Sequence, residues 1–397
     1  MVLRRPRVAT AAMFFVSGSV IGTWAGSVPY VRDRLDVSTS MIGLCLLAMA
    51  AGSVLAMIVV GRELDRRSSA TLTRLGALLV PLTGVLPLLA PSPAALALAL
   101  FALGVANGVL DVSMNAHGVA VEHAQERPVM SSLHGGWSLG GLVGAGAVAL
   151  GHVAGVDPRV EAAVFCALLL VGGLWFGRHL GDVSAATQGA GAAGGEGGAS
   201  VGASGSDGAA PAQARFVWPS RAILLIGSLS AMLFLSEGAI TDWSALYLDR
   251  DLGAAAAVAA VAYAGFAGGM AIGRFCGDAL NHRIGPARLL RWGSAAASLA
   301  LAATLLSGEP LLALPALALA GLGLANGVPL LFSAAGRSRE MSPGPAIAAV
   351  STMSYGGLLA GPPLLGFVAD LTSLPWALSA TVALTAVVAL AAGRAER

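Results

Sequence analysis

The strongest constraint on this chain is a series of unbroken apolar runs, each long enough to cross a lipid bilayer as a helix. About 20 apolar residues in a helix span a hydrocarbon core of about 30 Å. Strands of a membrane barrel would alternate apolar and polar residues, and these runs do not. Charged residues make up only 11% of the chain, against about a quarter in soluble proteins. The sequence therefore predicts an all-α integral membrane protein.

Turn signals and charged residues divide the chain into twelve such runs, so we expect twelve transmembrane helices. In the first half the predicted spans cover residues 8–31, 39–61, 72–90, 94–118, 131–155 and 159–180. In the second half they cover residues 220–248, 254–275, 287–307, 311–335, 344–368 and 373–393.

The distribution of arginine predicts how the chain is oriented. The 23 positive residues are all arginine, and 19 of them fall on the side that holds the N-terminus. The remaining four lie on the other side: Arg32, Arg34, Arg159 and Arg250. Short cytoplasmic loops carry the excess of arginine in membrane proteins. We therefore expect both termini to be cytoplasmic.

A tract of glycine, alanine and serine separates the sixth span from the seventh. Such a composition cannot bury enough apolar surface to order itself. We interpret residues 181–219 as a flexible cytoplasmic linker between an N-terminal bundle, residues 1–180, and a C-terminal bundle, residues 220–397.

The two halves are copies of each other. A shift of 219 residues maps the segment from Gly104 to Val109 onto the segment from Gly323 to Val328, and it also maps Trp24 onto Trp243. The first span therefore matches the seventh, and the fourth matches the tenth. Two six-helix pseudo-repeats in parallel orientation are typical of transporters that rock around a central site.

The loop after the second span, GRELDRRS, resembles the signature of the major facilitator superfamily (MFS). Gly61, Asp65 and Arg66 match that signature, and the second-half counterpart GRFCGDALNHRIG contains Asp278 and Arg283. The resemblance covers the whole chain and implies the MFS fold, with helices 1, 4, 7 and 10 lining a central cavity. It also implies that these five residues brace a cytoplasmic gate.

Three further segments, NGVLDVSMNA, RPVMSSLHGGWSLGG and SEGAITDWSALYL, resemble the YbjJ-like inner-membrane group near the fucose–proton symporter branch. This resemblance implies location in the bacterial cytoplasmic membrane. The glycine series 136–140–144 and 269–273–277 allow close helix contact. Because helices 5 and 8 of the superfamily meet at the junction of the halves, we expect these glycines to lie there.

The fourth span carries a carboxylate between two amides. Asn107, Asp111 and Asn115 are four residues apart and so share one helical face. A charged carboxylate at membrane depth costs at least ~2.5 kcal/mol, so it should face a wet cavity, pair with a cation or take up a proton. Burial favours the neutral carboxyl group, which suits a proton-coupling site, and the amides can hold a solute hydroxyl. Pairing with an arginine or a helix end is the alternative for Asp111.

The seventh and tenth spans carry further candidates. Glu237 and Thr241 share a face and could bind solute or couple protons, whereas Asp242 lies nearer the periplasmic end, where the position favours a gate or interface role over binding. Asn107 and Asn326 are repeated in both halves and could instead be helix-packing amides. Trp24 and Trp243 could stack on a sugar ring or anchor the helices at the membrane interface.

Other chemistries find little support. The stretch from Gly136 to Gly140 fits the G-x-S-x-G nucleophile pattern, but that motif needs a strand-to-helix turn and here lies in a predicted membrane helix. His117, His123 and His134 lie near the end of their spans and are weak ligand candidates. We expect no enzyme activity, no metal, no cofactor and no nucleic-acid partner.

The sequence therefore favours a monomeric secondary transporter that moves a small polar, sugar-like solute by alternating access. Its expected partners are the solute, protons and the bilayer, with coupling at Asp111 and also Glu237 as a candidate. Two alternatives stay open: an exporter of drugs or metabolites, and a transporter-like sensor that binds without translocating.

Overall fold

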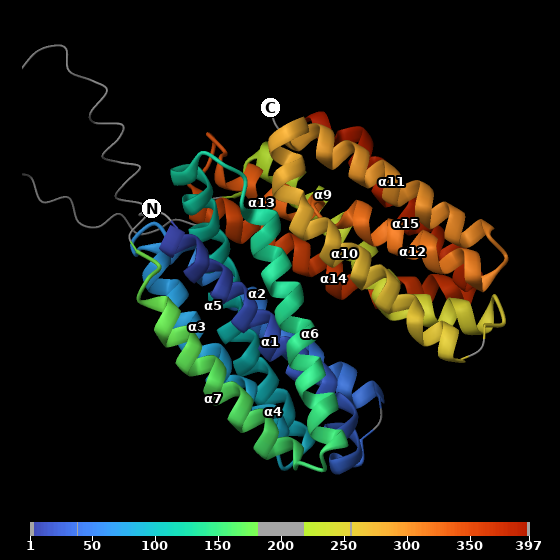
Figure 1. Ribbon diagram of the computed structural model, residues 1–397, viewed down its shortest axis with the longest axis horizontal. Coiled ribbons are helices and arrows are strands. Elements are labelled where there is room, and N and C mark those ends of the chain that lie inside the picture. The colour runs from blue at the N-terminus through green and yellow to red at the C-terminus, as the bar shows by residue number, and fades with distance from the viewer. Residues whose placement is uncertain (1–3, 38, 182–217, 255, 395–397) are drawn as a thin grey trace, which may run out of the picture.

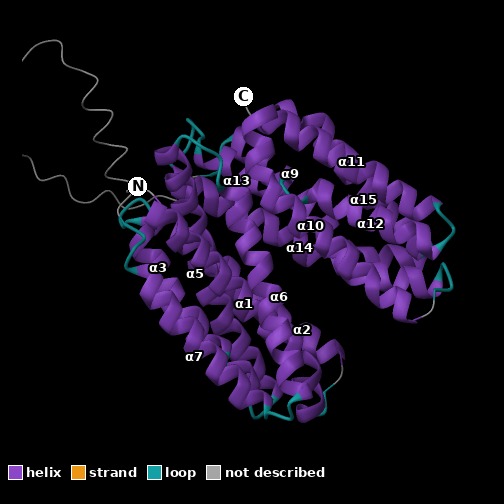
Figure 2. Ribbon diagram, viewed as in Figure 1, coloured by secondary structure: helices purple, strands orange, loops and turns teal. Residues whose placement is uncertain are grey.

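The computed structural model describes residues 4–37, 39–181, 218–254 and 256–394. Every regular element in these ranges is a helix (Figure 2). The predicted linker, residues 181–219, lies outside the described residues except at its two ends.

The twelve expected spans are confirmed, two of them in two pieces. The first half contains α1 (Arg4–Leu35), α2 (Thr39–Glu63), α3 (Ser69–Gly84), α4 (Leu86–Leu89), α5 (Pro93–Gln125), α6 (Met130–Val153) and α7 (Pro158–Gly177). The second half contains α9 (Arg221–Arg250), α10 (Ala256–Ile284), α11 (Pro286–Leu306), α12 (Pro310–Leu324), α13 (Gly327–Gly336), α14 (Pro343–Leu371), α15 (Leu374–Ala391) and the 3₁₀ turn η1 (Ala392–Arg394). Among the described residues, ten segments are long and apolar enough to cross a membrane, and α10 and α14 are not among these ten.

The tenth span is broken where its first-half counterpart is continuous. Helix α12 ends at Leu324, and α13 begins at Gly327. Pro329 stands at the position that Leu110 occupies in α5. Proline has no backbone N–H, and its ring clashes with the carbonyl group four residues earlier, here that of Ala325. The α-helical run therefore stops at Leu324 and restarts at Gly327, two residues before Pro329.

The packing inside each half repeats. In the first half α1 packs on α6, α2 on α5 and α3 on α7; in the second half α9 packs on α14, α10 on α12 and α11 on α15. These are corresponding helix pairs, so the two six-helix pseudo-repeats are confirmed. Both ends of the described chain lie at one end of the molecule (Figure 1), which we call the terminal face; the opposite end is the far face.

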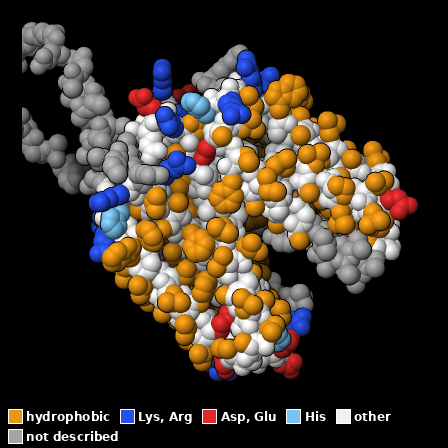
Figure 3. Space-filling view, in the orientation of Figure 1, with side chains coloured by type: hydrophobic (Ala, Val, Ile, Leu, Met, Phe, Trp, Pro, Cys, Tyr) orange, Lys and Arg blue, Asp and Glu red, His pale blue; other side chains and the backbone are white. Residues whose placement is uncertain are grey.

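The two bundles lie close together at the terminal face and diverge toward the far face (Figure 1). The space-filling view shows a hollow between them that opens on the far side (Figure 3). On the face seen in Figure 3, hydrophobic side chains cover much of both bundles, and charged side chains gather toward the ends. On α7, which lies on the side opposite the second bundle (Figure 1), Leu168 and Leu174 are 64% and 56% exposed, as expected for a lipid-facing surface.

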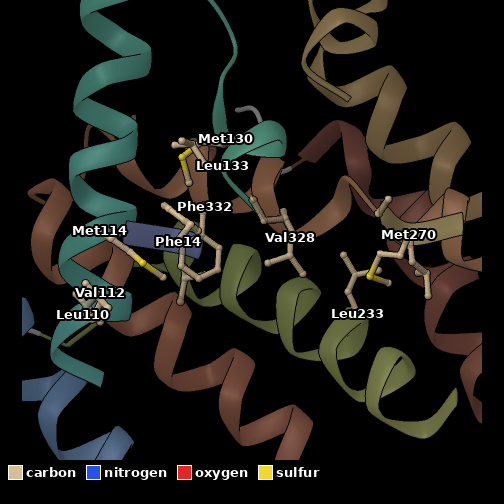
Figure 4. Close-up of a cluster of buried hydrophobic side chains, with 14 of the residues drawn as sticks. Phe14, Leu110, Val112, Met114, Met130, Leu133, Leu233, Met270, Val328 and Phe332 are labelled. Carbon is tan, nitrogen blue, oxygen red and sulfur yellow. The ribbon is translucent and has the colours of Figure 1, made fainter. Parts of the chain in front are cut away.

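An apolar layer fills the space between the two halves toward the terminal face. Phe14, Met114 and Leu133 of the first half meet Val328 and Phe332 of the second half, and all five are at most 3% exposed (Figure 4). Helix α2 packs on α14, and α6 packs on α10, across the same junction. The molecule is therefore closed toward its terminal face and open toward its far face.

The glycine series are not where we expected them. A Cβ atom on Gly140 or Gly144 would collide with backbone carbonyl groups of α1, and one on Gly269 would collide with a carbonyl group of α12. These glycines therefore allow close packing within each half. A Cβ atom on Gly277, in contrast, would meet a residue of the other half, the Ser131 side chain.

Candidate functional site

Asp111 lies near the middle of the longest described helix. It is 18 residues after Pro93 and 14 residues before Gln125 on α5, which is about 27 Å and about 21 Å along a helix that rises 1.5 Å per residue. The residue is partly exposed. The structure thus places one carboxyl group deep between the two faces of the molecule.

The hydrogen bonds of Asp111 connect the two halves. Ser351 Oγ on α14 donates to Asp111 Oδ2 at 3.3 Å. Asn115 Nδ2 donates to the Asp111 backbone carbonyl at 2.9 Å and lies 3.5 Å from Oδ1. Among the described residues, no arginine forms an ion pair with Asp111. Its partners are thus a hydroxyl group and an amide.

Asn107 forms a second link between the same two helices. Its Nδ2 donates to the Tyr355 hydroxyl group at 3.4 Å, and its Oδ1 accepts from Ser17 Oγ of α1 at 3.1 Å. Asn107 precedes Asp111 by one helical turn, and Tyr355 follows Ser351 by one turn. The two antiparallel helices therefore meet in two polar contacts on matching faces, which we call the α5–α14 ladder.

His134 extends this network toward the terminal face. Its Nε2 lies 3.2 Å from Asn115 Oδ1, and because a carbonyl oxygen can only accept, the imidazole donates. The His134 ring centroid is 5.1 Å from that of Phe14 and 6.0 Å from that of Phe332. The polar network therefore ends against the apolar layer. Sequence reasoning gave His134 little weight because its contacts with α1, α5 and α13 leave no local pattern.

Glu237 does not belong to the Asp111 network. Its Oε1 lies 3.4 Å from Arg274 Nη2, and Arg274 Nη1 also donates to Ser138 Oγ of the other half. Arg274 is only 5% exposed, and its Nε is buried without a partner. Our sequence assignment counted Arg274 among the arginines at the terminal side, and this was wrong. It lies ten residues, or about 15 Å, before the end of α10.

The remaining candidates of α1 and α9 lie apart from the α5–α14 ladder. Thr241 and Asp242 are exposed, and Thr241 Oγ1 donates to the Glu237 backbone carbonyl at 2.8 Å. Trp243 is partly buried, its indole nitrogen has no partner, and it lies beside Gly366. Trp24 is buried in the core of the first half, at 4% exposure.

Asn326 packs against α10. Its Nδ2 donates to the Gly273 carbonyl group at 3.1 Å, and its Oδ1 is buried without a partner. The side chain lies at the break between α12 and α13 and is 6% exposed. This placement corresponds to the helix-packing alternative, and it does not bring Asn326 to Asp111.

The two gate motifs lie at the terminal face, where each reaches the other half. Asp65 Oδ1 accepts from Ser342 Oγ, the N-cap residue of α14, at 2.9 Å. Gly61 lies directly against Ala348 of α14. Arg66 instead pairs with Glu63 in its own segment, at 3.4 Å.

Asp278 reaches the start of α6. Its two carboxylate oxygens accept from the backbone N–H groups of Ser131 and Ser132, at 3.0 and 3.1 Å. These N–H groups have no partner inside their own helix, and the positive end of the helix dipole favours a carboxylate. Arg7 Nη2 lies 3.9 Å from Asp278 Oδ2. Arg283 is exposed and forms no ion pair with a described residue.

An ion pair between Glu122 and Arg337 also links the two halves at the terminal face, and neither residue belongs to the two gate motifs. Glu122 of α5 is 5% exposed, and its Oε2 accepts from the backbone N–H groups of Val129 and Met130 at 2.9 and 3.2 Å. Its Oε1 pairs with Arg337 Nη1 of the second half at 3.0 Å. Sequence reasoning missed this pair because the two residues lie 215 positions apart.

Comparison with known proteins identifies the family. A model of the Major Facilitator Superfamily matches residues 9–342. An uncharacterized MFS-type transporter of Yersinia pestis is 32% identical over 391 residues, which are 98% of this chain and 96% of that protein.

Solved structures agree on the fold. FucP, the E. coli fucose:proton symporter, has been solved in the outward conformation; that structure is 17% identical, with a TM-score of 0.73 over 99% of both chains. The proton:xylose symporter XylE is 12% identical, with a TM-score of 0.73 over 100% of this chain and 96% of that one.

Proposed function

Because this chain belongs to the Major Facilitator Superfamily and is therefore a multi-pass secondary transporter, not an enzyme, we propose that it moves a small polar, sugar-like solute coupled to protons at Asp111. We also place it in the YbjJ-like group of that superfamily. The observation that carries the proposal is the position of Asp111 in the α5–α14 ladder, deep between the faces and without an arginine partner among the described residues.

Such a carboxyl group has hydrogen-bond partners in both of its protonation states. When ionised, it accepts hydrogen bonds from Ser351 and Asn115; when protonated, it can also donate. The Ser351 contact crosses between the halves, and a rocking motion must break or rebuild it. Gain or loss of the proton therefore changes a hydrogen bond between the two halves. Coupled transport requires such a link between protonation and the relative position of the halves.

The arginine distribution supports a cytoplasmic terminal face and a periplasmic far face. In that orientation the hollow between the bundles admits solute from outside the cell, while the apolar layer and the gate contacts close the inner side. Asp65, Asp278 and Glu122 each contribute to that closure through a contact with the other half. Alternating access then requires all three contacts to open together.

The groups between the halves suit a solute rich in hydroxyl groups. Asn107 and Tyr355 offer amide and phenol groups, and the Tyr355 ring lies 6.0 Å from Phe234. Amides and aromatic rings bind hydroxyl groups and the apolar faces of small polar molecules, respectively. Glu237 is the second candidate for coupling, although it pairs with Arg274, whereas Asp111 forms no ion pair within the described part of the chain.

The proposal is tested by transport into proteoliposomes. Solutes would first be selected by thermal stabilisation of the purified protein with sugars, polyols, amino acids and cationic drugs, since a ligand of the native state raises Tm. For a solute that binds, uptake driven by a proton gradient should be lost in Asp111→Asn, whereas exchange of internal for external solute should remain. Asp370→Asn, an exposed aspartate at the far end of α14, is the matched control.

Proton-driven uptake in Asp111→Asn at the rate of the Asp370→Asn control would eliminate Asp111 as the coupling group. Stabilisation by cationic drugs alone, with transport toward the far face, would favour the exporter. Saturable binding without any flux would favour the sensor.

A further inference from the structure

A basic pocket lies on the outer side of the first bundle, away from the junction of the halves. It encloses about 350 Å³ at the terminal end of α3 and α7 and is lined by Arg74, Gly173, Leu174, Gly177 and Arg178. Helices α3 and α7 pack on each other and lie on the side of the molecule opposite the second bundle (Figure 1). The pocket therefore opens toward lipid and not toward the solute path.

The two arginines are fixed in place but not neutralised. Arg74 Nε donates to the Gly177 carbonyl group at 2.8 Å, and Arg178 Nε donates to the Trp175 carbonyl group at 3.0 Å. Neither arginine forms an ion pair with a described residue. A guanidinium group has five N–H donors, so both keep most of their donors and their full charge for a ligand.

The terminal ends of α3 and α7, which carry the pocket, are tied together through α5. His117, which is fully buried on α5, lies 3.0 Å from Ser69 Oγ at the start of α3 and 3.0 Å from the Leu180 carbonyl group just after α7. Gly173 and Gly177 have no side chains to fill the hollow, and a Cβ on Gly177 would touch the Arg74 side chain at 3.5 Å. The arginines therefore present their charge from a preformed position.

The surface around the pocket suits an acyl chain. Val171, Leu174 and Leu75 are 66%, 56% and 43% exposed on the two helices. Trp175 is 58% exposed, and the Arg178 guanidinium carbon lies 3.6 Å from its ring centroid. Exposed tryptophan next to arginine is typical of the level of the lipid headgroups. Figure 3 shows the positive side chains gathered at this end of the bundle, above an apolar flank.

We propose that this pocket binds the phosphate group of an anionic phospholipid, with the acyl chains lying along α3 and α7. Two guanidinium groups match a phosphate in charge and geometry, and basic pockets between helices at the membrane surface bind such headgroups. The lipid holds the terminal ends of α3 and α7 together on the side of the first bundle that does not take part in the gate.

The test measures lipid binding to the full chain purified in a neutral detergent. Phosphatidylglycerol and cardiolipin should raise Tm, and phosphatidylcholine should not. In the double variant Arg74→Gln, Arg178→Gln, the apparent affinity for the anionic lipids should fall by about 25-fold, since each arginine near a membrane surface contributes about fivefold. Native mass spectrometry should show the matching loss of retained anionic lipid.

The second half offers a matched control. Arg291, near the start of α11, lies beside Gly393, and Arg394 is the next residue after Gly393. These ends of α11 and α15 correspond to the ends of α3 and α7 that carry the pocket. The double variant Arg291→Gln, Arg394→Gln removes the same charge at the same level, and it should keep the preference for anionic lipid.

Three results would overturn the proposal: equal stabilisation by phosphatidylcholine, equal loss of affinity in both double variants, or full stabilisation by inorganic phosphate alone. If loss of the Arg74 bond to α7 prevents folding, Arg178→Gln alone leaves that bond intact. It should then weaken anionic-lipid binding about fivefold, and an unchanged affinity would again refute the site.

Discussion

The Glu237–Arg274 pair predicts an asymmetric response to neutralisation of its two members. Breaking a buried ion pair by removing one partner costs about 3–5 kcal/mol. The lower end of that range applies here, because the pair is 3.4 Å apart and the Glu237 side chain is 22% exposed. The two single variants should differ in stability, because a carboxylate left alone can take up a proton, whereas a guanidinium group stays charged.

We therefore expect Glu237→Gln to lower the free energy of unfolding by about 3 kcal/mol. For Arg274→Gln we expect about 1.5 kcal/mol, because the remaining carboxyl group becomes neutral and costs only as much as an unsatisfied buried polar group. At about 2 °C per kcal/mol for a large domain, these losses correspond to Tm decreases of about 6 °C and 3 °C. The double variant should lie within about 1 kcal/mol of the parent protein, since it leaves no unpaired charge. Thermal unfolding in detergent, monitored with a thiol-reactive dye, gives the Tm of the two single variants and of the double variant.

An exposed pair provides the control for this cycle. Arg32 and Asp33 are 2.8 Å apart, with side-chain exposures of 47% and 68%, and exposed pairs contribute about 0.2–1 kcal/mol. Neutralising either residue should change Tm by about 2 °C or less. Equal losses in Glu237→Gln and Arg274→Gln would contradict the predicted asymmetry, and a double variant whose loss is the sum of the two would show that the pair is not coupled. Either result would refute the reasoning.

Two further predictions concern closure at the terminal face. Gly61→Val places a side chain against Ala348 and should hold the two halves apart there. Uptake should be abolished, and alkylation of cysteines introduced behind the apolar layer should increase. Gly43→Val is the control, because Gly43 has open space around it, and it should leave uptake and alkylation unchanged. Arg337→Gln leaves Glu122 bound only to backbone N–H groups. The variant should fold, and alkylation of the same cysteines should increase by about threefold to tenfold, since the ion pair contributes about 1 kcal/mol. Unchanged alkylation would mean that this pair does not hold the halves together.

The helices could be predicted from the sequence because each is a local property of an apolar run. Their ends were less accurate: we expected the fourth span to end at residue 118, whereas α5 continues to Gln125. The last two turns carry Glu122 and His123, polar residues that end an apolar run without ending a helix. The break before Pro329 was also missed, although proline is its local signal, because an apolar run continues through it.

The candidate site could be predicted only along single helices. The spacing of Asn107, Asp111 and Asn115 is fixed by the helical repeat, and the structure keeps them on one face. Ser351 and Tyr355 were not found, since their contacts with α5 depend on the tilt and rotation of α14, which one sequence does not contain. Arg274 was misplaced for a related reason: a charge near the end of an apolar run can lie inside or outside the membrane.

The contact between Asp278 and α6 has an evolutionary consequence. Its receiving groups are two backbone N–H groups, which every residue except proline supplies. These two hydrogen bonds therefore do not depend on which side chains stand at positions 131 and 132, provided that neither residue becomes proline. Among the described residues the ion-pair partner of Asp278 is Arg7, whose Nη2 lies 3.9 Å from Asp278 Oδ2, so any paired change should appear at position 7. A comparison of many related sequences should show a constant acid at position 278 with no correlated change at 131 or 132, so methods that infer contacts from paired substitutions would overlook this part of the gate.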